Sequence, residues 1–212
     1  MTETMNFIIA VDGPAASGKG TVAGALARHY GLPYLDTGLL YRAVGVHAQA
    51  AGGLDEATAA SVAQDLNAAL LDHPKARTRE AGEWASRVAA HPTVRAALLD
   101  YQHQFAGQHG GAVLDGRDIG TVIAPQAPAK LFVTATPEVR ASRRWKQLIE
   151  QGEQVSYDDM LADILRRDER DRGRSASPLV RAADAALLDT SEVTIELAFR
   201  EARRLVEEAL GR

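Results

Sequence analysis

The chain alternates between short apolar runs and longer segments in which apolar residues recur at helical spacing. The runs predict strands buried on both faces, at residues 7–11, 33–36, 112–115, 130–134 and 186–189. The longer segments predict helices at residues 19–30, 39–51, 137–152, 156 to about 170, and 195–209. Strands that alternate with helices are typical of an α/β fold with a mainly parallel sheet flanked by helices.

Residues 54–110 interrupt this alternation. They are alanine-rich and helical in pattern, and none of their apolar runs predicts a strand. A helical excursion inside an α/β order predicts an inserted subdomain rather than a second independent domain. We therefore expect a single domain with its core at about 5–53 and 111–212 and a helical insert at about 54–110.

The composition is that of an ordinary globular protein. Its 212 residues suffice for one well-buried core, with 46% hydrophobic and 25% charged residues. The net charge of −4 argues against a nucleic-acid-binding surface, and the lack of cysteine excludes disulfides and zinc–thiolate sites. The apolar run near the N-terminus is only five residues long, too short for a leader or a membrane span. A cytoplasmic monomer is the expected state.

A glycine-rich segment, GPAASGKGT, connects the first predicted strand to the first predicted helix. Gly13 permits a tight turn, Gly18 permits close approach to phosphate, and Lys19 adds a mobile cation beside the N–H groups of the helix start. The competing interpretation is a simple glycine turn with a solvated lysine. Strand, spacing and helix favour a phosphate-binding loop formed by Gly13, Pro14, Ala15, Ala16, Ser17, Gly18, Lys19, Gly20 and Thr21.

Gly20 stands where the common phosphate-loop pattern has serine or threonine. That hydroxyl binds Mg²⁺ directly in GTPases and motor ATPases, so its absence disfavours those classes. The phosphate cradle itself is not weakened. A glycine after the lysine resembles the loop of the nucleoside-monophosphate kinases.

Further motifs narrow this resemblance. They are DTG with YR at 36–42, SRVA with VR at 86–95, DGRDIGT at 115–121 and RDERDRGR at 167–174. In this order, and over nearly the whole chain, they resemble the bacterial cytidylate (CMP/dCMP) kinases. The resemblance implies a P-loop NTPase-type parallel sheet, ATP as phosphoryl donor, Mg²⁺, and CMP or dCMP as acceptor. It also implies an arginine-rich lid at about 153–177 that closes over both nucleotides.

The same resemblance assigns three groups of acceptor residues. Arg42 and Arg117 are assigned to the substrate phosphate, Arg174 reaches the phosphates from the lid, and Thr37 lies in the acceptor site. Those at the base are Ser86, Arg95 and Asp118. Those at the sugar are Arg167 and Asp171. Cytosine offers an amino donor to a carboxylate and two acceptors to an arginine, whereas uracil would meet the carboxylate with a carbonyl. Catalysis is then expected of Lys19, Arg117 and Arg174.

Two of these features have simpler alternatives. Asp115 ends a buried strand, where it could hold a water of the Mg²⁺ shell or cap its own turn. The run at 166–174 holds five arginines and three acids, and such a run is also typical of a solvated, salt-bridged helix end.

Other functions fit parts of the pattern. A different small P-loop kinase could act on UMP, AMP or a non-nucleotide such as shikimate. A nucleotide-dependent switch without transfer activity is a third possibility, although its guanine-reading N-K-x-D motif is absent. Between Leu71 and Arg77 the chain has only DHPKA, where many family members carry a longer segment, so a trimmed and more helical insert is expected.

Overall fold

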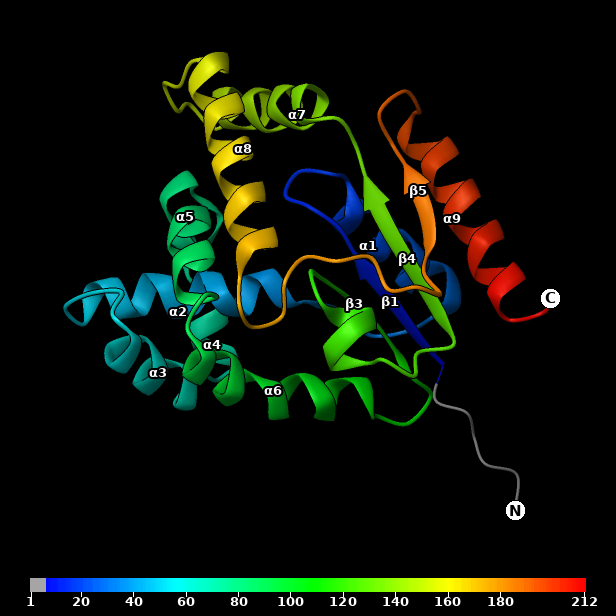
Figure 1. Cartoon of the computed structure of the whole chain (residues 1–212), viewed down its shortest axis with the longest axis horizontal. Helices are drawn as coiled ribbons and strands as arrows, with labels where there is room; N and C mark the ends of the chain where they lie inside the picture. The colour runs from blue at the N-terminus through cyan, green and yellow to red at the C-terminus, as the bar shows by residue number, and fades with distance from the viewer. Residues whose placement is uncertain (1–6) are drawn as a thin grey trace.

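A computed structural model of the chain describes residues 7–212, so the predicted start of the core at residue 5 lies outside the described residues. Five strands form one parallel sheet in the order β2-β3-β1-β4-β5 (Figure 1). They are β1 (Ile8–Asp12), β2 (Tyr34–Asp36), β3 (Ala112–Gly116), β4 (Ala129–Thr134) and β5 (Ala186–Asp189). The predicted α/β fold with a parallel sheet is confirmed, and each strand lies within one residue of its predicted ends.

Alternate side chains of β1 point to opposite faces of the sheet and build two cores. The helices on these faces are α1 (Lys19–Tyr30), α2 (Thr37–Ala50), α6 (Pro92–Ala106) and α9 (Ile195–Ala209). Ile9 and Val11 pack with α1 and α9, whereas Ala10 between them packs with α2 and α6. The sheet is therefore covered on both sides, as its continuous apolar strands require. Within residues 7–212, no helix combines the length and the apolar character needed to cross a membrane.

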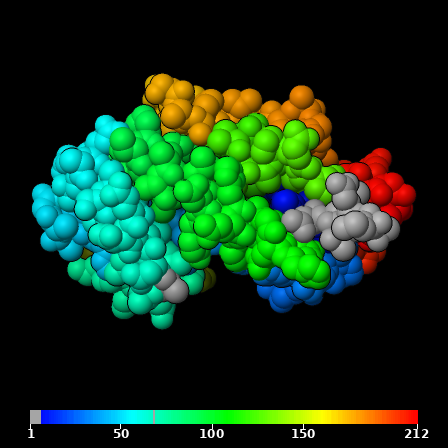
Figure 2. Space-filling view, turned by 90° about the horizontal axis from the view of Figure 1, so that it is seen from below, coloured from blue at the N-terminus to red at the C-terminus, as the bar shows by residue number. Residues whose placement is uncertain are grey.

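The segment predicted as an insert is helical throughout its ordered elements. It contains α3 (Glu56–Gln64), α4 (Ala68–Leu71), a 3₁₀ turn (Pro74–Arg77), α5 (Arg79–Val88) and α6. No strand lies among the described residues between α2 and β3. Figure 2 shows the cyan part of this segment at one end of the molecule, the green part extending across the middle, and α9, in red, at the other end. The division into core, insert and lid stays a prediction.

The helices α7 (Pro137–Glu150) and α8 (Tyr157–Gly173) pack against each other through a small apolar cluster. Both helices start at the predicted caps, since the hydroxyls of Thr136 and Ser156 accept hydrogen bonds from N–H groups three residues later. The helix α8 is continuous and lies beside α5 (Figure 1). The arginine-rich run is thus held on a helix that faces the insert.

The contact between α2 and α5 fixes the insert on the core and is tight at Gly45. An added Cβ at this position would lie 2.7 Å from Cβ of Trp84. Gly45→Ala is therefore expected to lower the free energy of unfolding by about 1–3 kcal/mol, as overpacking does.

Gly24→Ala in α1 is the matched control. A Cβ there meets only the end of the Arg28 side chain, at 3.6 Å. Its higher helix propensity should raise the free energy of unfolding by up to about 1 kcal/mol. Urea unfolding of both variants and the parent measures the difference, and a Gly45→Ala protein as stable as the parent would contradict the described packing.

Candidate active site

Three loops meet at one edge of the sheet because β2, β3 and β1 are adjacent and parallel. The end of β1 continues into the glycine-rich loop, the end of β2 into Thr37, and the end of β3 into residues 115–118. In open parallel sheets, ligands bind at the carboxyl ends of the strands. Motifs that are far apart in the sequence therefore lie at one place in the fold.

The glycine-rich loop leads into α1, so the free N–H groups of the first helical turn lie beside it. Gly18 has a φ of 83°, a left-handed conformation that suits glycine. Gly13 is needed for a reason other than a tight turn, because a Cβ there would lie 2.0 Å from the carbonyl oxygen of Val133 on β4. Burial lowers the pKa of the Lys19 ammonium, and the Asp115 carboxylate opposes that shift. The loop thus presents N–H donors and one cation to an anion.

The Asp115 carboxylate occupies the space beside Gly20. An added Cβ at position 20 would lie 3.0 Å from Asp115 Oδ2 and 3.5 Å from the hydroxyl oxygen of Tyr34. The Tyr34 hydroxyl donates a hydrogen bond of 3.1 Å to the same Oδ2, and Lys19 Nζ lies 4.0 Å from it. A serine or threonine side chain at position 20 would crowd the Asp115 carboxylate, a contact that glycine avoids.

The other oxygen of Asp115, Oδ1, is buried and has no hydrogen-bond partner among the described residues. Burial raises the pKa of Asp115 to about 6, and Lys19 opposes the shift. A carboxylate oxygen without a donor fits a Mg²⁺ ion or a water of its shell. Within residues 7–212, no cluster of three or more His, Asp or Glu could hold an ion unaided. Since the carboxylate contacts Tyr34 and Lys19, capping of its own turn does not explain it.

Eight of the nine predicted acceptor residues line one small cavity: Thr37, Ser86, Arg95, Arg117, Asp118, Arg167, Asp171 and Arg174. The ninth, Arg42, lines an adjoining larger cavity that shares Arg117 and Arg167 with the first. The small cavity measures about 40 Å³. One water molecule takes about 30 Å³ of liquid volume, so side chains must move before a nucleotide base can enter.

The residues predicted to contact the base are paired with each other. Arg95 and Asp118 form a buried ion pair, and Arg95 Nη1 also donates to the carbonyl oxygen of Ala89 at 3.4 Å. The guanidinium lies 5.5 Å from the centre of the Tyr41 ring, a cation–π distance. Tyr41 belongs to the motif at 36–42 but was not predicted as a site residue. A planar group bound here would have to replace these contacts with its own.

The Asp171 carboxylate collects side chains from several elements and is only 2% exposed. Arg117 Nε donates to its Oδ2 at 3.0 Å, and Ser86 Oγ donates to its Oδ1 at 3.4 Å. Arg174 Nη2 and Arg167 Nε lie 3.2 and 3.9 Å from its two oxygens. Burial raises the pKa of Asp171, but the three guanidinium groups outweigh burial and hold that pKa below its usual value. The structure thus makes Asp171 a counter-ion for arginines, while its predicted contact with the sugar stays a prediction.

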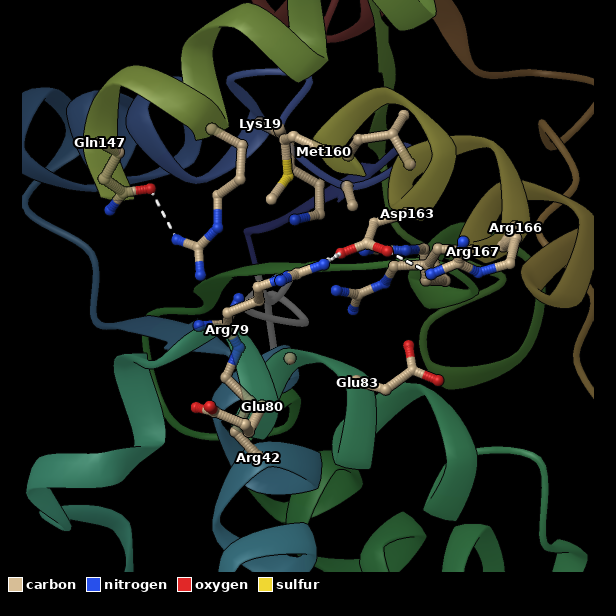
Figure 3. Close-up of a pocket in the computed structure, with 16 residues that line it drawn as sticks. Lys19, Arg42, Arg79, Glu80, Glu83, Gln147, Met160, Asp163, Arg166 and Arg167 are labelled. Atoms are coloured by element: carbon tan, nitrogen blue, oxygen red, sulfur yellow. Dashed lines mark hydrogen bonds and ion pairs between the residues drawn. The ribbon is translucent and has the colours of Figure 1, made fainter. Parts of the chain in front are cut away.

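The larger cavity, of about 500 Å³, lies between the glycine-rich loop, α5, α7 and α8 (Figure 3). It is lined by three carboxylates, Glu80, Glu83 and Asp163, and by seven cations, Lys19, Arg42, Arg79, Arg117, Arg144, Arg166 and Arg167. This excess of positive charge is local, because the chain as a whole carries −4. Burial, together with the nearby Arg117, lowers the pKa of Arg167 to about 9. Such a cavity fits a polyanion.

Ion pairs connect α5 with α8 across this region. Arg79 Nε donates to Asp163 Oδ2 at 2.7 Å, and Arg170 Nη2 lies 2.8 Å from Glu83 Oε1. In Figure 3 the labelled α8 side chains project from one side of the cavity and those of α5 from the other. Sequence reasoning missed Arg79 and Arg144, because a lone arginine on a helix carries no signal until the fold places it at a cavity.

Asp12, the last residue of β1, holds the loop that follows β3. Its two carboxylate oxygens accept hydrogen bonds of 2.8 Å from the N–H groups of Ile119 and Gly120. These residues begin a short π-helix, Ile119–Ile123. Burial raises the pKa of Asp12 to about 7, although the two N–H groups favour its charged form. The strand that leads into the phosphate loop therefore also fixes the loop of the acceptor residues.

A parallel sheet with a phosphate-binding loop after β1, and arginines facing it from flanking helices, defines a P-loop kinase. A family model described as cytidylate kinase matches residues 9–208. The chain belongs to the cytidylate kinase family, so the family that the sequence motifs indicated is confirmed.

Individual relatives are similar to the chain over nearly their whole length. A cytidylate kinase from Caulobacter vibrioides (strain NA1000 / CB15N) is 65% identical over 210 residues, which cover 98% of this chain and 99% of the relative. One from Xanthobacter autotrophicus is 63% identical over 95% of this chain and 97% of the relative. A crystal structure of an uncharacterized protein from Eubacterium ventriosum is similar in fold alone, with a TM-score of 0.59 and 16% identity over 95% of this chain and 99% of that one.

A serine placed at position 20 tests the packing around Asp115. Because its Cβ would lie 3.0 Å from Oδ2, Gly20→Ser should displace the carboxylate instead of adding a metal ligand. Phosphoryl transfer is expected to slow about tenfold, the effect of about 1.4 kcal/mol on a barrier. Adding Tyr34→Phe, which removes the neighbouring hydroxyl, should restore part of the rate. A coupled kinase assay measures all three proteins, and a Gly20→Ser enzyme with the parental rate would contradict this reading.

Proposed function

We propose that the enzyme transfers the γ-phosphoryl group of ATP to the 5′-phosphate of CMP or dCMP, assisted by Mg²⁺. The observation that supports this proposal is one small cavity lined by the ion pair Arg95–Asp118 together with Arg117, Arg167 and Arg174. That cavity shares two arginines with a larger cationic cavity that reaches Lys19 of the phosphate loop. Donor and acceptor phosphates would therefore meet among the same cations.

The donor phosphates would lie on the glycine-rich loop. Its N–H groups and Lys19 supply hydrogen bonds and charge from the start of α1. Asp115 Oδ1, which has no hydrogen-bond partner within residues 7–212, would hold Mg²⁺ through water, with the remaining ligands supplied by phosphate and water oxygens. When bound, Mg²⁺ neutralises part of the charge on the transferred group.

The acceptor base would be recognised by Asp118, Arg95 and Ser86. Cytosine can donate from its amino group to the Asp118 carboxylate and accept from the Arg95 guanidinium. In the structure these two groups satisfy each other, so cytosine would replace one buried polar contact with another. Uracil would place a carbonyl against the carboxylate, a buried mismatch of about 1–3 kcal/mol. This difference supports a preference for cytidine nucleotides.

Phosphoryl transfer requires no general base, because the attacking oxygen belongs to a phosphate that is already an anion. The task left to the protein is to position two polyanions and offset their charge at a loose, in-line transition state. Lys19, Arg117 and Arg174 would surround the transferred group, with Arg42 and Thr37 at the acceptor phosphate. Closure of the lid at 153–177 would exclude water and so limit hydrolysis of ATP. We further propose that the enzyme acts as a cytoplasmic monomer.

Lys19→Ala tests the donor site. The variant should lose phosphoryl transfer almost completely. Its circular dichroism and thermal unfolding should stay close to those of the parent, because the Lys19 side chain, at the start of α1, lines the larger cavity and does not pack in an apolar core. Lys146→Ala, which removes an exposed lysine from α7, is the control. A Lys19→Ala enzyme with near-parental turnover would contradict the assignment.

Asp118→Asn tests base recognition. The amide can donate to a carbonyl, so kcat/KM should fall for CMP and dCMP and the ratio of UMP to CMP turnover should rise, by roughly 5- to 150-fold for a change of 1–3 kcal/mol. Asp100→Asn on the exposed face of α6 is the control. Turnover with CMP, dCMP, UMP and AMP is compared side by side. Turnover of the parent with AMP or UMP alone would refute the proposed acceptor, and an unchanged ratio in the variant would refute the role of Asp118.

A further inference from the structure

Arg140 of α7 is buried, with 1% of its surface exposed, although it carries a charge. Its Nε donates to the carbonyl oxygen of Ala135 at 2.9 Å. Its Nη1 and Nη2 donate to the two carboxylate oxygens of Asp168 on α8 at 2.9 and 2.5 Å. Nη1 also donates to the carbonyl oxygen of Ala15, inside the phosphate loop, at 3.2 Å. One guanidinium group therefore joins α7, α8 and the phosphate loop.

The bond to Ala15 fixes the direction of one peptide group. Within residues 7–212 every peptide bond is trans, and in a trans peptide the C=O and N–H groups point in opposite directions. Because the Ala15 carbonyl points at Arg140, the N–H of Ala16 must point to the opposite side of the loop. Ala16 also has a φ of 59°, a left-handed conformation that a residue with a side chain adopts only when its surroundings hold it there. An N–H group held in such a turn contributes to an anion-binding concavity.

We infer that Arg140 is a positioning residue, which holds the Ala15–Ala16 peptide so that the Ala16 N–H faces the donor phosphates and which ties the loop to α8 through Asp168. This inference rests on the proposed function. Arg140 itself is enclosed by protein and touches neither cavity. It would act on the nucleotide only through the backbone that it orients.

The ion pair between Arg140 and Asp168 also connects the phosphate loop to α8. Asp168 is 3% exposed and lies on α8 between Arg167 and Asp171, which line the acceptor cavity. Buried ion pairs are weak evidence for stability, because desolvation offsets their attraction and apolar residues of similar volume serve as well. A role in geometry therefore accounts better for this pair than a role in stability. When α8 moves over the nucleotides, it would pivot about the Arg140–Asp168 pair, which is bonded to the phosphate loop through Ala15.

The decisive test separates geometry from stability. The double variant Arg140→Met, Asp168→Leu removes both buried charges and keeps apolar volume between α7 and α8, so its free energy of unfolding should stay close to that of the parent. It also removes the bond to Ala15. We expect the Kd for the non-hydrolysable ATP analogue AMP-PNP, measured by calorimetry, to rise at least tenfold, with a matching rise in KM for ATP, while the Kd for CMP changes less than threefold.

A second variant covers the case in which the double variant does not fold. Arg140→Lys keeps a charge opposite Asp168, but its single nitrogen cannot replace the bonds to Ala135, Ala15 and both carboxylate oxygens. Its Kd for AMP-PNP should rise at least fivefold. Arg204→Met, which removes an exposed arginine that pairs with Glu201 and Glu208 on α9, is the matched control and should leave the Kd unchanged.

The outcomes are distinct. Weaker AMP-PNP binding in a folded variant, with CMP binding retained, supports the inference. Folded variants that bind AMP-PNP within twofold of the parent overturn it and leave the proposed function intact. A parent protein that binds no AMP-PNP refutes the proposed donor site and the inference together.

Discussion

Repulsion among arginines is the constraint on which the site depends. Arg117, Arg167 and Arg174 converge on one carboxylate, that of Asp171, and without this counter-ion three partly buried cations would repel one another in a small volume. The carboxylate leaves them short of full neutralisation, since Arg117 still lowers the pKa of Arg167. The site therefore keeps an excess of positive charge at the position where the phosphates of two nucleotides would meet. Binding of those phosphates would complete a charge balance that the folded chain leaves open.

The parallel sheet brings the other parts to that position. Since β2, β3 and β1 are neighbours, the acceptor loops and the phosphate loop leave the same edge side by side. Asp12 then links two of these loops directly through its bonds to Ile119 and Gly120. Arg140 links the phosphate loop to α8 on the opposite side. Each catalytic group thus lies on a segment that at least one buried polar contact holds in place.

Much of this could be predicted from the sequence, because the relevant signals are local. Apolar runs gave the strands, capping residues gave the starts of α7 and α8, and spaced motifs gave the family and the residues of the acceptor cavity. What could not be predicted depends on contacts between distant residues. Nothing near Arg140 in the sequence indicates that it meets Ala15 and Asp168, and nothing near Gly20 indicates that Asp115 occupies its side-chain space. The part that Asp171 plays as a counter-ion likewise follows only from packing.

The two ion pairs between α5 and α8 bear on how fast substrates can exchange. Arg79 and Arg170 are 38% and 30% exposed in their side chains, so their bonds to Asp163 and Glu83 lie partly in water. Partly exposed pairs contribute about 0–1 kcal/mol each and are screened by salt. Separating α5 from α8 therefore costs little compared with the several charge-assisted contacts that bound phosphates would gain. The same link that keeps the cavity formed between turnovers is weak enough for nucleotides to enter and leave, and raising the ionic strength loosens it further.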